Sequence, residues 1–169
     1  VSARVGEHRV DRELALRLVA DIRGAGLPVV GVSYGGNDAS EAELPLDWGT
    51  EIPLRYIPAE RVVVIAPARD RPLEEHIRLG QVLASCSLQL SLVASADHAH
   101  AHREDGPYGF DPAAAEYDRR FQELVASGDF RPLAELVDAA KADSLWQLLV
   151  LQGFAGGRPL ELLAYAAPT

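Results

Sequence analysis

Three of the chain's five histidines lie within five residues, at His98, His100 and His102, where they alternate with alanines. In an extended segment alternate side chains lie on the same face, so the three imidazoles are expected to share one face. Neutral imidazole is a common metal ligand, and imidazole also exchanges a proton near neutral pH. The histidine row therefore predicts a metal site or a proton-transfer site. The alternative is a solvated loop, since charged residues follow directly at 103–105.

The elements around the row predict where it lies in a fold. An apolar run at residues 88–94 precedes the row and is expected to form a strand. A β-branched apolar run at residues 61–67 is typical of a strand covered on both faces. Between them, Pro72 suits the first turn of a helix that reaches about Cys86. Strand, helix and strand favour a right-handed parallel unit, with the row at the carboxyl end of the second strand, where ligands usually bind.

The rest of the chain predicts mainly helices. Asp11 is expected to cap a helix that ends near Ala25, and residues 27–34 are typical of a short buried strand. Residues 39–56 lack a sustained period and are expected to form a long loop, either functional or packed. Further helices are predicted at residues 112–127, 130–140 and 144–152. Residues 160–166 fit either a strand or a short helix.

Length and composition limit the class of protein. The 169 residues suffice for one domain, for which we expect an α/β fold with a mostly parallel central sheet flanked by helices and a helical C-terminal third. The formal charge of −9, from 16 basic and 25 acidic residues, argues against nucleic-acid binding. Cys86 is alone, which excludes an internal disulfide. No apolar run approaches the roughly 20 residues that cross a bilayer, so we expect a soluble, cytoplasmic protein. Self-association is left open.

Six short motifs occur in order between residues 33 and 147. They are Ser33-Tyr34, Leu46-Asp47-Trp48-Gly49-Thr50, Leu79-Gly80, Ser95-Ala96-Asp97-His98-Ala99-His100, Gly106-Pro107-Tyr108-Gly109-Phe110-Asp111 and Asp143-Ser144-Leu145-Trp146-Gln147. In these motifs and their order the chain resembles the catalytic subunits of class III extradiol ring-cleaving dioxygenases, together with the related Memo-like proteins.

The resemblance implies an iron(II)-dependent enzyme that opens the ring of a catechol or an aminophenol with dioxygen. Its Ser-x-Asp-x-x-His motif places the family's acid–base residue at His100. The family's carboxylate ligand of iron matches Asp143 most closely, although Asp143 would serve equally well as a helix N-cap. The remaining candidates are His102 as a metal ligand and Asp47, Tyr108 and His98 as substrate-binding residues.

The chain departs from the family pattern at its N-terminal end. Two iron-binding histidines normally lie upstream in the family, and no motif here supplies them. Either the chain is the C-terminal part of a longer dioxygenase-like protein, or it is a shortened relative without the iron site. The start at Val1 and the absence of methionine favour the first explanation. The alternative function is a non-catalytic domain of the same fold that binds a metal ion such as zinc or copper, or a partner.

Overall fold

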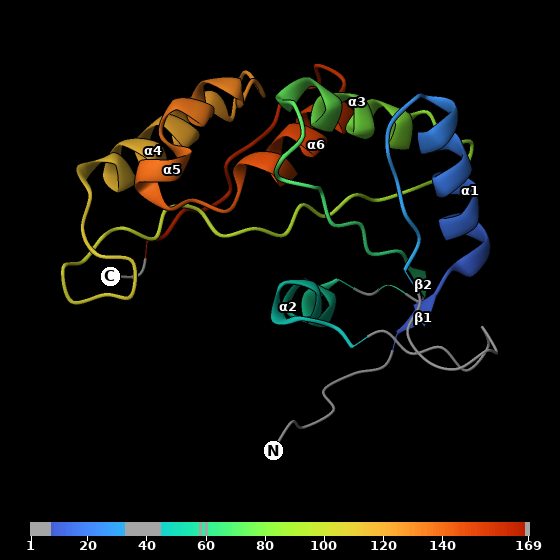
Figure 1. The fold of residues 1–169 in the computed structure, drawn as a ribbon, viewed down its shortest axis with the longest axis horizontal. Coiled ribbons are helices and arrows are strands. Elements are labelled where there is room, and N and C mark those ends of the chain that lie inside the picture. The colour runs from blue at the N-terminus through green and yellow to red at the C-terminus, as the bar shows by residue number, and fades with distance from the viewer. Residues whose placement is uncertain (1–7, 33–44, 58, 60, 168–169) are drawn as a thin grey trace. The chain divides into compact units, whose positions relative to one another are not determined.

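A computed structural model provides the structure of the protein, which describes residues 8–32, 45–57, 59 and 61–167. The regular structure of these residues comprises six α-helices, one short 3-10 helix and a two-stranded parallel sheet (Figure 1). The mixed α/β class is therefore confirmed. The chain divides into two compact units, Val1–Ala66 and Pro67–Thr169. The expectation of one domain stays a prediction.

The sheet of the N-terminal unit is short. Strands β1 (Arg9–Val10) and β2 (Arg61–Val62) pair in parallel. The strand expected over residues 61–67 is thus only two residues long. Residues 27–32 and 88–94 form no strand in the described part of the chain. A β-branched run becomes a strand only where another segment pairs with its backbone groups, and the sequence of the run does not specify that segment.

Helix α1 (Arg12–Gly24) confirms the prediction for this segment. Its N-cap is Asp11, whose side chain accepts a hydrogen bond of 3.0 Å from the backbone N–H three residues later. Leu18 and Ile22 are buried, as the apolar spacing predicts. The helix is followed by Gly26, whose φ of 77° is readily adopted only without a Cβ.

Residues 48–56 form helix α2 (Trp48–Tyr56), so the expectation of a loop was wrong there. Asp47 is the N-cap and accepts a hydrogen bond of 2.8 Å from the N–H of Thr50. Gly49 and Pro53 lie inside the helix, and both residue types disfavour helix. Because of these two residues, helix propensity and hydrophobic period did not predict the helix.

The C-terminal unit consists mainly of helices. In chain order they are α3 (Leu73–Ala84), α4 (Pro112–Leu124), η1 (Arg131–Glu135), α5 (Val137–Ala140) and α6 (Leu145–Ala155). The predicted helix at 130–140 is therefore divided into a 3-10 turn and a single α-helical turn, and residues 160–166 are neither helix nor strand. Within the described ranges, no helix combines the length and the apolar character needed to cross a membrane.

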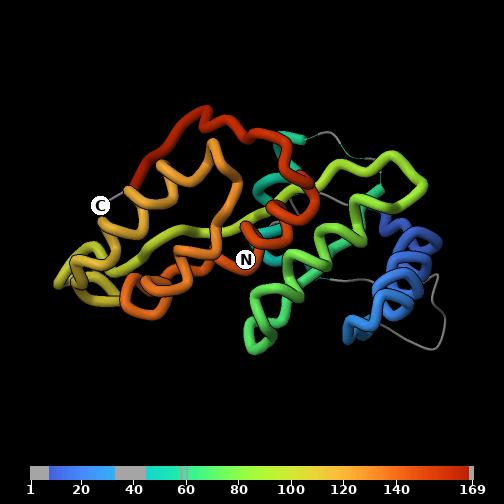
Figure 2. The backbone as a smooth tube through the Cα atoms, turned by 90° about the horizontal axis from the view of Figure 1, so that it is seen from above, coloured from blue at the N-terminus to red at the C-terminus, as the bar shows by residue number. Residues whose placement is uncertain are grey.

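Helices α3 and α6 lie side by side (Figure 2). They approach closely because a glycine of each helix faces the other. A Cβ on Gly80 would lie 2.0 Å from the carbonyl oxygen of Val150. A Cβ on Gly153 would lie 1.9 Å from the carbonyl oxygen of Ile77. No side chain fits at either position unless the backbone moves.

Helices α4, α5 and α6 enclose the main core together with η1. Its larger members are Tyr117, Phe121, Phe130, Leu133, Val137, Leu145, Leu148 and Leu149. Burial of a side chain of this size contributes about 1.5–3 kcal/mol. Ala99, between two histidines of the row, packs against this core, and Ala101 is 1% exposed. The core therefore anchors the alanines of the histidine row.

Candidate active site

The histidine row is tied to the end of α5 by its backbone. The carbonyl oxygen of Ala140 accepts the N–H of His100 at 3.0 Å and the N–H of Ala101 at 3.2 Å. One carbonyl group thus holds two adjacent residues of the row. The backbone hydrogen bond to Ala140 holds His100 in position independently of its side-chain contacts.

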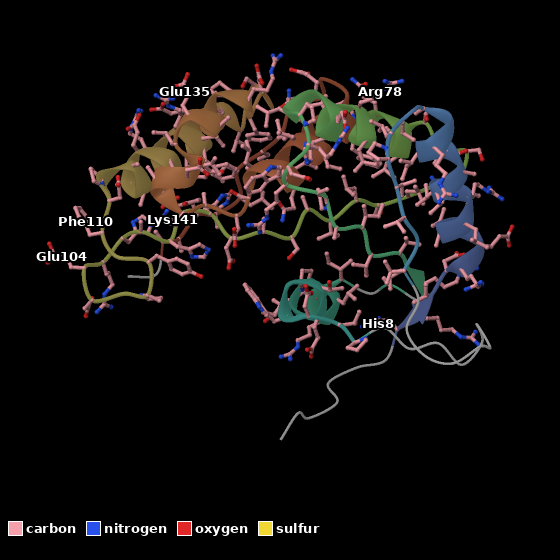
Figure 3. The ribbon with its side chains drawn as sticks, viewed as in Figure 1. His8, Arg78, Glu104, Phe110, Glu135 and Lys141 are labelled. Atoms are coloured by element: carbon pink, nitrogen blue, oxygen red, sulfur yellow. The ribbon has the colours of Figure 1, made fainter. Side chains whose placement is uncertain are left out.

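A second backbone bond brings Asp143 to the same place. The N–H of Asp143 donates to the carbonyl oxygen of Asp97 at 3.2 Å. The chain turns between α5 and α6 at Lys141, whose φ of 53° lies in the left-handed region, where residues with a Cβ are uncommon (Figure 3). This turn places Asp143 beside His100.

The imidazole of His100 lies close to the side chains of both Asp143 and Tyr108. Its Nε2 lies 3.8 Å from Oδ2 of Asp143. Its ring stacks on Tyr108, with ring centroids 4.8 Å apart and planes inclined by 23°. The His100 side chain is 23% exposed, so it is shielded without being closed off. A separation of 3.8 Å exceeds a direct hydrogen bond and suits one oxygen atom that bridges the two groups.

Tyr108 reaches His100 because the loop after the row folds back. An antiparallel bridge pairs His102 with Phe110, which Figure 3 labels. Gly109 has a φ of 74°, which permits the reversal at low cost. The sequence predicted Tyr108 as a substrate-binding residue, and the structure places it at His100. Contact with a substrate stays a prediction.

Asp143 does not cap helix α6, so the N-cap alternative was wrong. The N-cap position is Ser144, which makes no capping bond with its side chain. Oδ1 of Asp143 instead accepts a hydrogen bond of 2.7 Å from Nη1 of Arg69. The guanidinium carbon of Arg69 lies 4.8 Å from the centre of the Trp146 ring. The carboxylate therefore lies between a guanidinium and the imidazole of His100.

His98 faces the core. Its Nδ1 lies 3.0 Å from Oγ of Ser144, which also lies 2.9 Å from the hydroxyl of Tyr117. Its ring packs on Phe121 with centroids 4.0 Å apart. Burial lowers the pKa of His98 against the opposing effect of the Asp118 charge, and burial raises the pKa of Tyr117 to about 12. Both groups are thus favoured in their neutral forms, and a substrate contact of His98 stays a prediction.

His102 lies near a different carboxylate. Its Nε2 is 3.0 Å from Oδ2 of Asp118, without hydrogen-bond geometry. The other oxygen of Asp118 accepts the N–H of Ala99 at 3.3 Å. Asp118 is buried on α4 and is 6% exposed. It therefore contacts the row on both sides of His100.

Two residues of the site were missed by the reading of the sequence. Asp118 belongs to the buried face of α4 with Ala114, Tyr117 and Phe121. An acidic residue at a position of the apolar stripe is the signal that could have found it. Arg69 carries no such signal, because its partner Asp143 is 74 residues away along the chain.

The described residues do not assemble the iron ligands that the resemblance implies. A non-haem iron(II) site of this type needs two imidazoles and a carboxylate around one ion. No group of three or more His, Cys, Asp or Glu side chains among the described residues is placed to hold an ion. His102 lies at Asp118, and Asp143 is paired with Arg69. Metal roles for Asp143 and His102 stay predictions.

The remaining candidate, Asp47, lies in the N-terminal unit. Its carboxylate caps α2, which is a sufficient structural reason for an acidic residue at this position. Substrate binding by Asp47 stays a prediction. The motif at Ser33-Tyr34 lies outside the described residues.

Comparison with known proteins agrees with the motifs. Residues 3–166 match the family described as the catalytic LigB subunit of aromatic ring-opening dioxygenase. The chain is also 26% identical over 131 residues to Protein CA_C1420 of Clostridium acetobutylicum. That alignment covers 73% of this chain but only 28% of the relative, so the chain spans little more than a quarter of its length. The link to Memo-like proteins stays a prediction. The chain belongs to the family of catalytic LigB subunits of aromatic ring-opening dioxygenases.

Proposed function

We propose that the protein takes part in the opening of an aromatic ring by dioxygen and that His100 is its acid–base residue. One observation carries the proposal. The main chain of His100 is held by a hydrogen bond to Ala140, and its largely buried imidazole lies between the carboxylate of Asp143 and the ring of Tyr108. Fixed geometry of this kind is what a proton-transfer residue requires.

The chemistry begins with the proton of a phenolic hydroxyl group. A phenol has a pKa of about 10, so it is mostly protonated at neutral pH and needs a base to become electron-rich. Nε2 of His100 can accept that proton, and the carboxylate of Asp143 at 3.8 Å stabilises the resulting imidazolium. The same nitrogen can return the proton to an oxygen atom of the product. Because the proton is returned, His100 is regenerated in each cycle.

Tyr108 would orient the substrate in this scheme. Its ring already lies against the imidazole of His100 and is 54% exposed, so one part of the ring is available to a planar molecule. Aromatic pairs prefer offset or edge-on contacts, which would hold a substrate ring with its hydroxyl toward His100. This arrangement supports an aromatic substrate over an aliphatic one.

The finer assignments follow from the resemblance. We propose a catechol or an aminophenol as substrate, cleavage next to the hydroxyl-bearing carbons, and iron(II) as cofactor. The described residues do not supply a complete iron site, so an iron site of this type requires ligands beyond them.

Turnover of His100 variants tests the proposal. Oxygen uptake and the loss of substrate absorbance would be followed for iron-loaded protein with a panel of catechols and aminophenols. His100→Ala should lower kcat by roughly 100-fold or more, the usual contribution of a positioned acid or base. Arg103→Gln, in an exposed ion pair of the same loop, is the matched control and should leave kcat unchanged. Near-normal turnover by His100→Ala would remove the assignment.

A further inference from the structure

The carboxylate of Asp143 is the least expected feature of the site. We infer that Asp143 is a positioning residue for His100, held in place by Arg69, and that it is not a metal ligand. The inference rests on the proposed role of His100, because it concerns how that imidazole is oriented. It reverses the role that the resemblance implies for Asp143.

Both oxygen atoms of Asp143 already face other groups. Oδ1 accepts a hydrogen bond of 2.7 Å from Nη1 of Arg69, and Oδ2 lies 3.8 Å from Nε2 of His100. A metal ion bound to Oδ1 would have to displace the guanidinium, and an ion bound elsewhere on the carboxylate would lie close to its positive charge. Like charges at such distances repel each other. The surroundings of Asp143 therefore favour an interaction of its carboxylate with the imidazole of His100 over the binding of a metal ion.

Arg69 makes contacts beside Asp143 with both its side chain and its main chain. Its guanidinium lies over the ring of Trp146, an arrangement that attracts a cation. Nε1 of the same Trp146 donates to the carbonyl oxygen of Arg69 at 3.1 Å. One residue earlier, the carbonyl oxygen of Ala68 lies 3.0 Å from Nε2 of the buried His76. Both the guanidinium and the backbone of Arg69 therefore have specific partners.

Asp143 and Trp146 come from the same short segment of chain. Asp143 precedes α6 by two residues, and Trp146 is the second residue of that helix. The start of α6 therefore supplies both the carboxylate that Arg69 binds and the ring on which Arg69 lies. Such an arrangement fixes the carboxylate relative to the helix, and the N–H of Asp143 fixes it relative to the histidine row through Asp97.

The gap between Asp143 and His100 shows what the pair could bind. A hydroxyl oxygen can lie within about 2.8 Å of both Oδ2 and Nε2 when those atoms are 3.8 Å apart. A phenolic hydroxyl in that position would donate its proton to Nε2 and lie beside the carboxylate, whose charge favours the imidazolium that forms. The pair thereby selects a hydroxyl-bearing ring by direct contact with the reacting group.

The orientation of the His100 ring tests the inference in the 169-residue chain. Imidazole proton and nitrogen signals would be recorded by NMR for the wild type, D143N, R69Q and R69K. D143N and R69Q should move the His100 signals, and R69K, which keeps the charge, should restore part of the shift. R103Q is the matched control, because Arg103 forms a similar exposed pair with Asp105. His100 signals that stay in place in both D143N and R69Q would overturn the inference.

Affinity for iron(II) supplies an independent measurement. Anaerobic calorimetric titration should give the same Kd for the wild type, D143N and R69Q within about threefold. A metal ligand would behave differently, since loss of D143's carboxylate would weaken binding by about tenfold or more, and R69Q would tighten it by freeing that carboxylate. Either of those results would overturn the inference. If the chain takes up no iron, the His100 signals alone decide.

The failures of the two proposals are distinguishable. Normal turnover by His100→Ala removes the proposed function and leaves the arrangement around Asp143 untouched. Unmoved His100 signals in D143N remove the positioning role and leave His100 as an acid–base candidate. Thermal unfolding of each variant shows whether it is folded. If D143N does not fold, R69Q tests the inference instead, because the Arg69 side chain is half-exposed and its replacement disturbs the fold less.

Discussion

The buried carboxylate of Asp118 lies 3.0 Å from Nε2 of His102 at one end of the histidine row. The same carboxylate accepts the N–H of Ala99 at 3.3 Å, and its charge acts on the hydroxyl of Tyr165 in the C-terminal segment. Burial, and to a smaller extent the Asp118 carboxylate, raises the pKa of Tyr165 well above its usual value. Asp118 therefore joins α4 to the row that carries His100.

Asp118→Ala should lower the free energy of unfolding by about 1–3 kcal/mol, because it leaves a buried N–H without its acceptor. Urea unfolding would measure this loss. Hydrogen exchange of the Ala99 amide should also become faster. Asp138→Ala, at an exposed position on α5, is the control and should change stability by less than about 0.5 kcal/mol. Equal effects of the two substitutions would contradict the role of Asp118.

Ser144 should be energetically coupled to Tyr117. Ser144→Ala leaves the Tyr117 hydroxyl and Nδ1 of His98 without this partner and should cost about 1–3 kcal/mol. Tyr117→Phe removes one member of the same pair. In a double-mutant cycle by urea unfolding, the double variant should cost less than the sum of the single variants by at least about 0.5 kcal/mol. Simple additivity would show that the two hydroxyl groups do not interact.

His98 should make stability depend on pH. Burial lowers its pKa below the ordinary value of 6.5 in the folded protein, so the unfolded chain binds this proton more readily. The contribution to stability is present above about pH 6.5 and is lost as the pH falls toward the folded-state pKa. Between about pH 7.5 and pH 5.5, the wild type should therefore lose more unfolding free energy than His98→Gln. The other histidines are common to both proteins, so their effects cancel, and parallel pH curves would contradict the prediction.

The contact between α3 and α6 should not tolerate a methyl group. Gly80→Ala and Gly153→Ala each place a Cβ about 2 Å from a backbone oxygen, and such overpacking costs about 1–3 kcal/mol or more. Gly24→Ala is the matched control, because a Cβ there meets no atom within 4 Å. Thermal unfolding should show lower Tm values for the first two variants only. A Gly80→Ala variant as stable as the wild type would mean that the helices are less tightly packed.

Local features of this protein could be predicted from its sequence. Asp11 caps α1, and Pro112 begins α4 after its N-cap Asp111, because a cap needs only a side chain and the amides within three residues of it. The family also followed from short motifs. The same motifs make His100 the acid–base candidate, and that role stays a prediction. Such signals are complete within a few consecutive residues.

Only the tertiary structure decided which distant groups meet. The three histidines of the row look equivalent in sequence, yet His98 lies at Ser144, His100 lies at Asp143, and His102 lies at Asp118. The same holds for the pairing of Arg69 with Asp143. The physical reason is that an ion pair or a strand pairing depends on two backbone segments brought together by packing. A single segment specifies its own conformation far better than it specifies its partner.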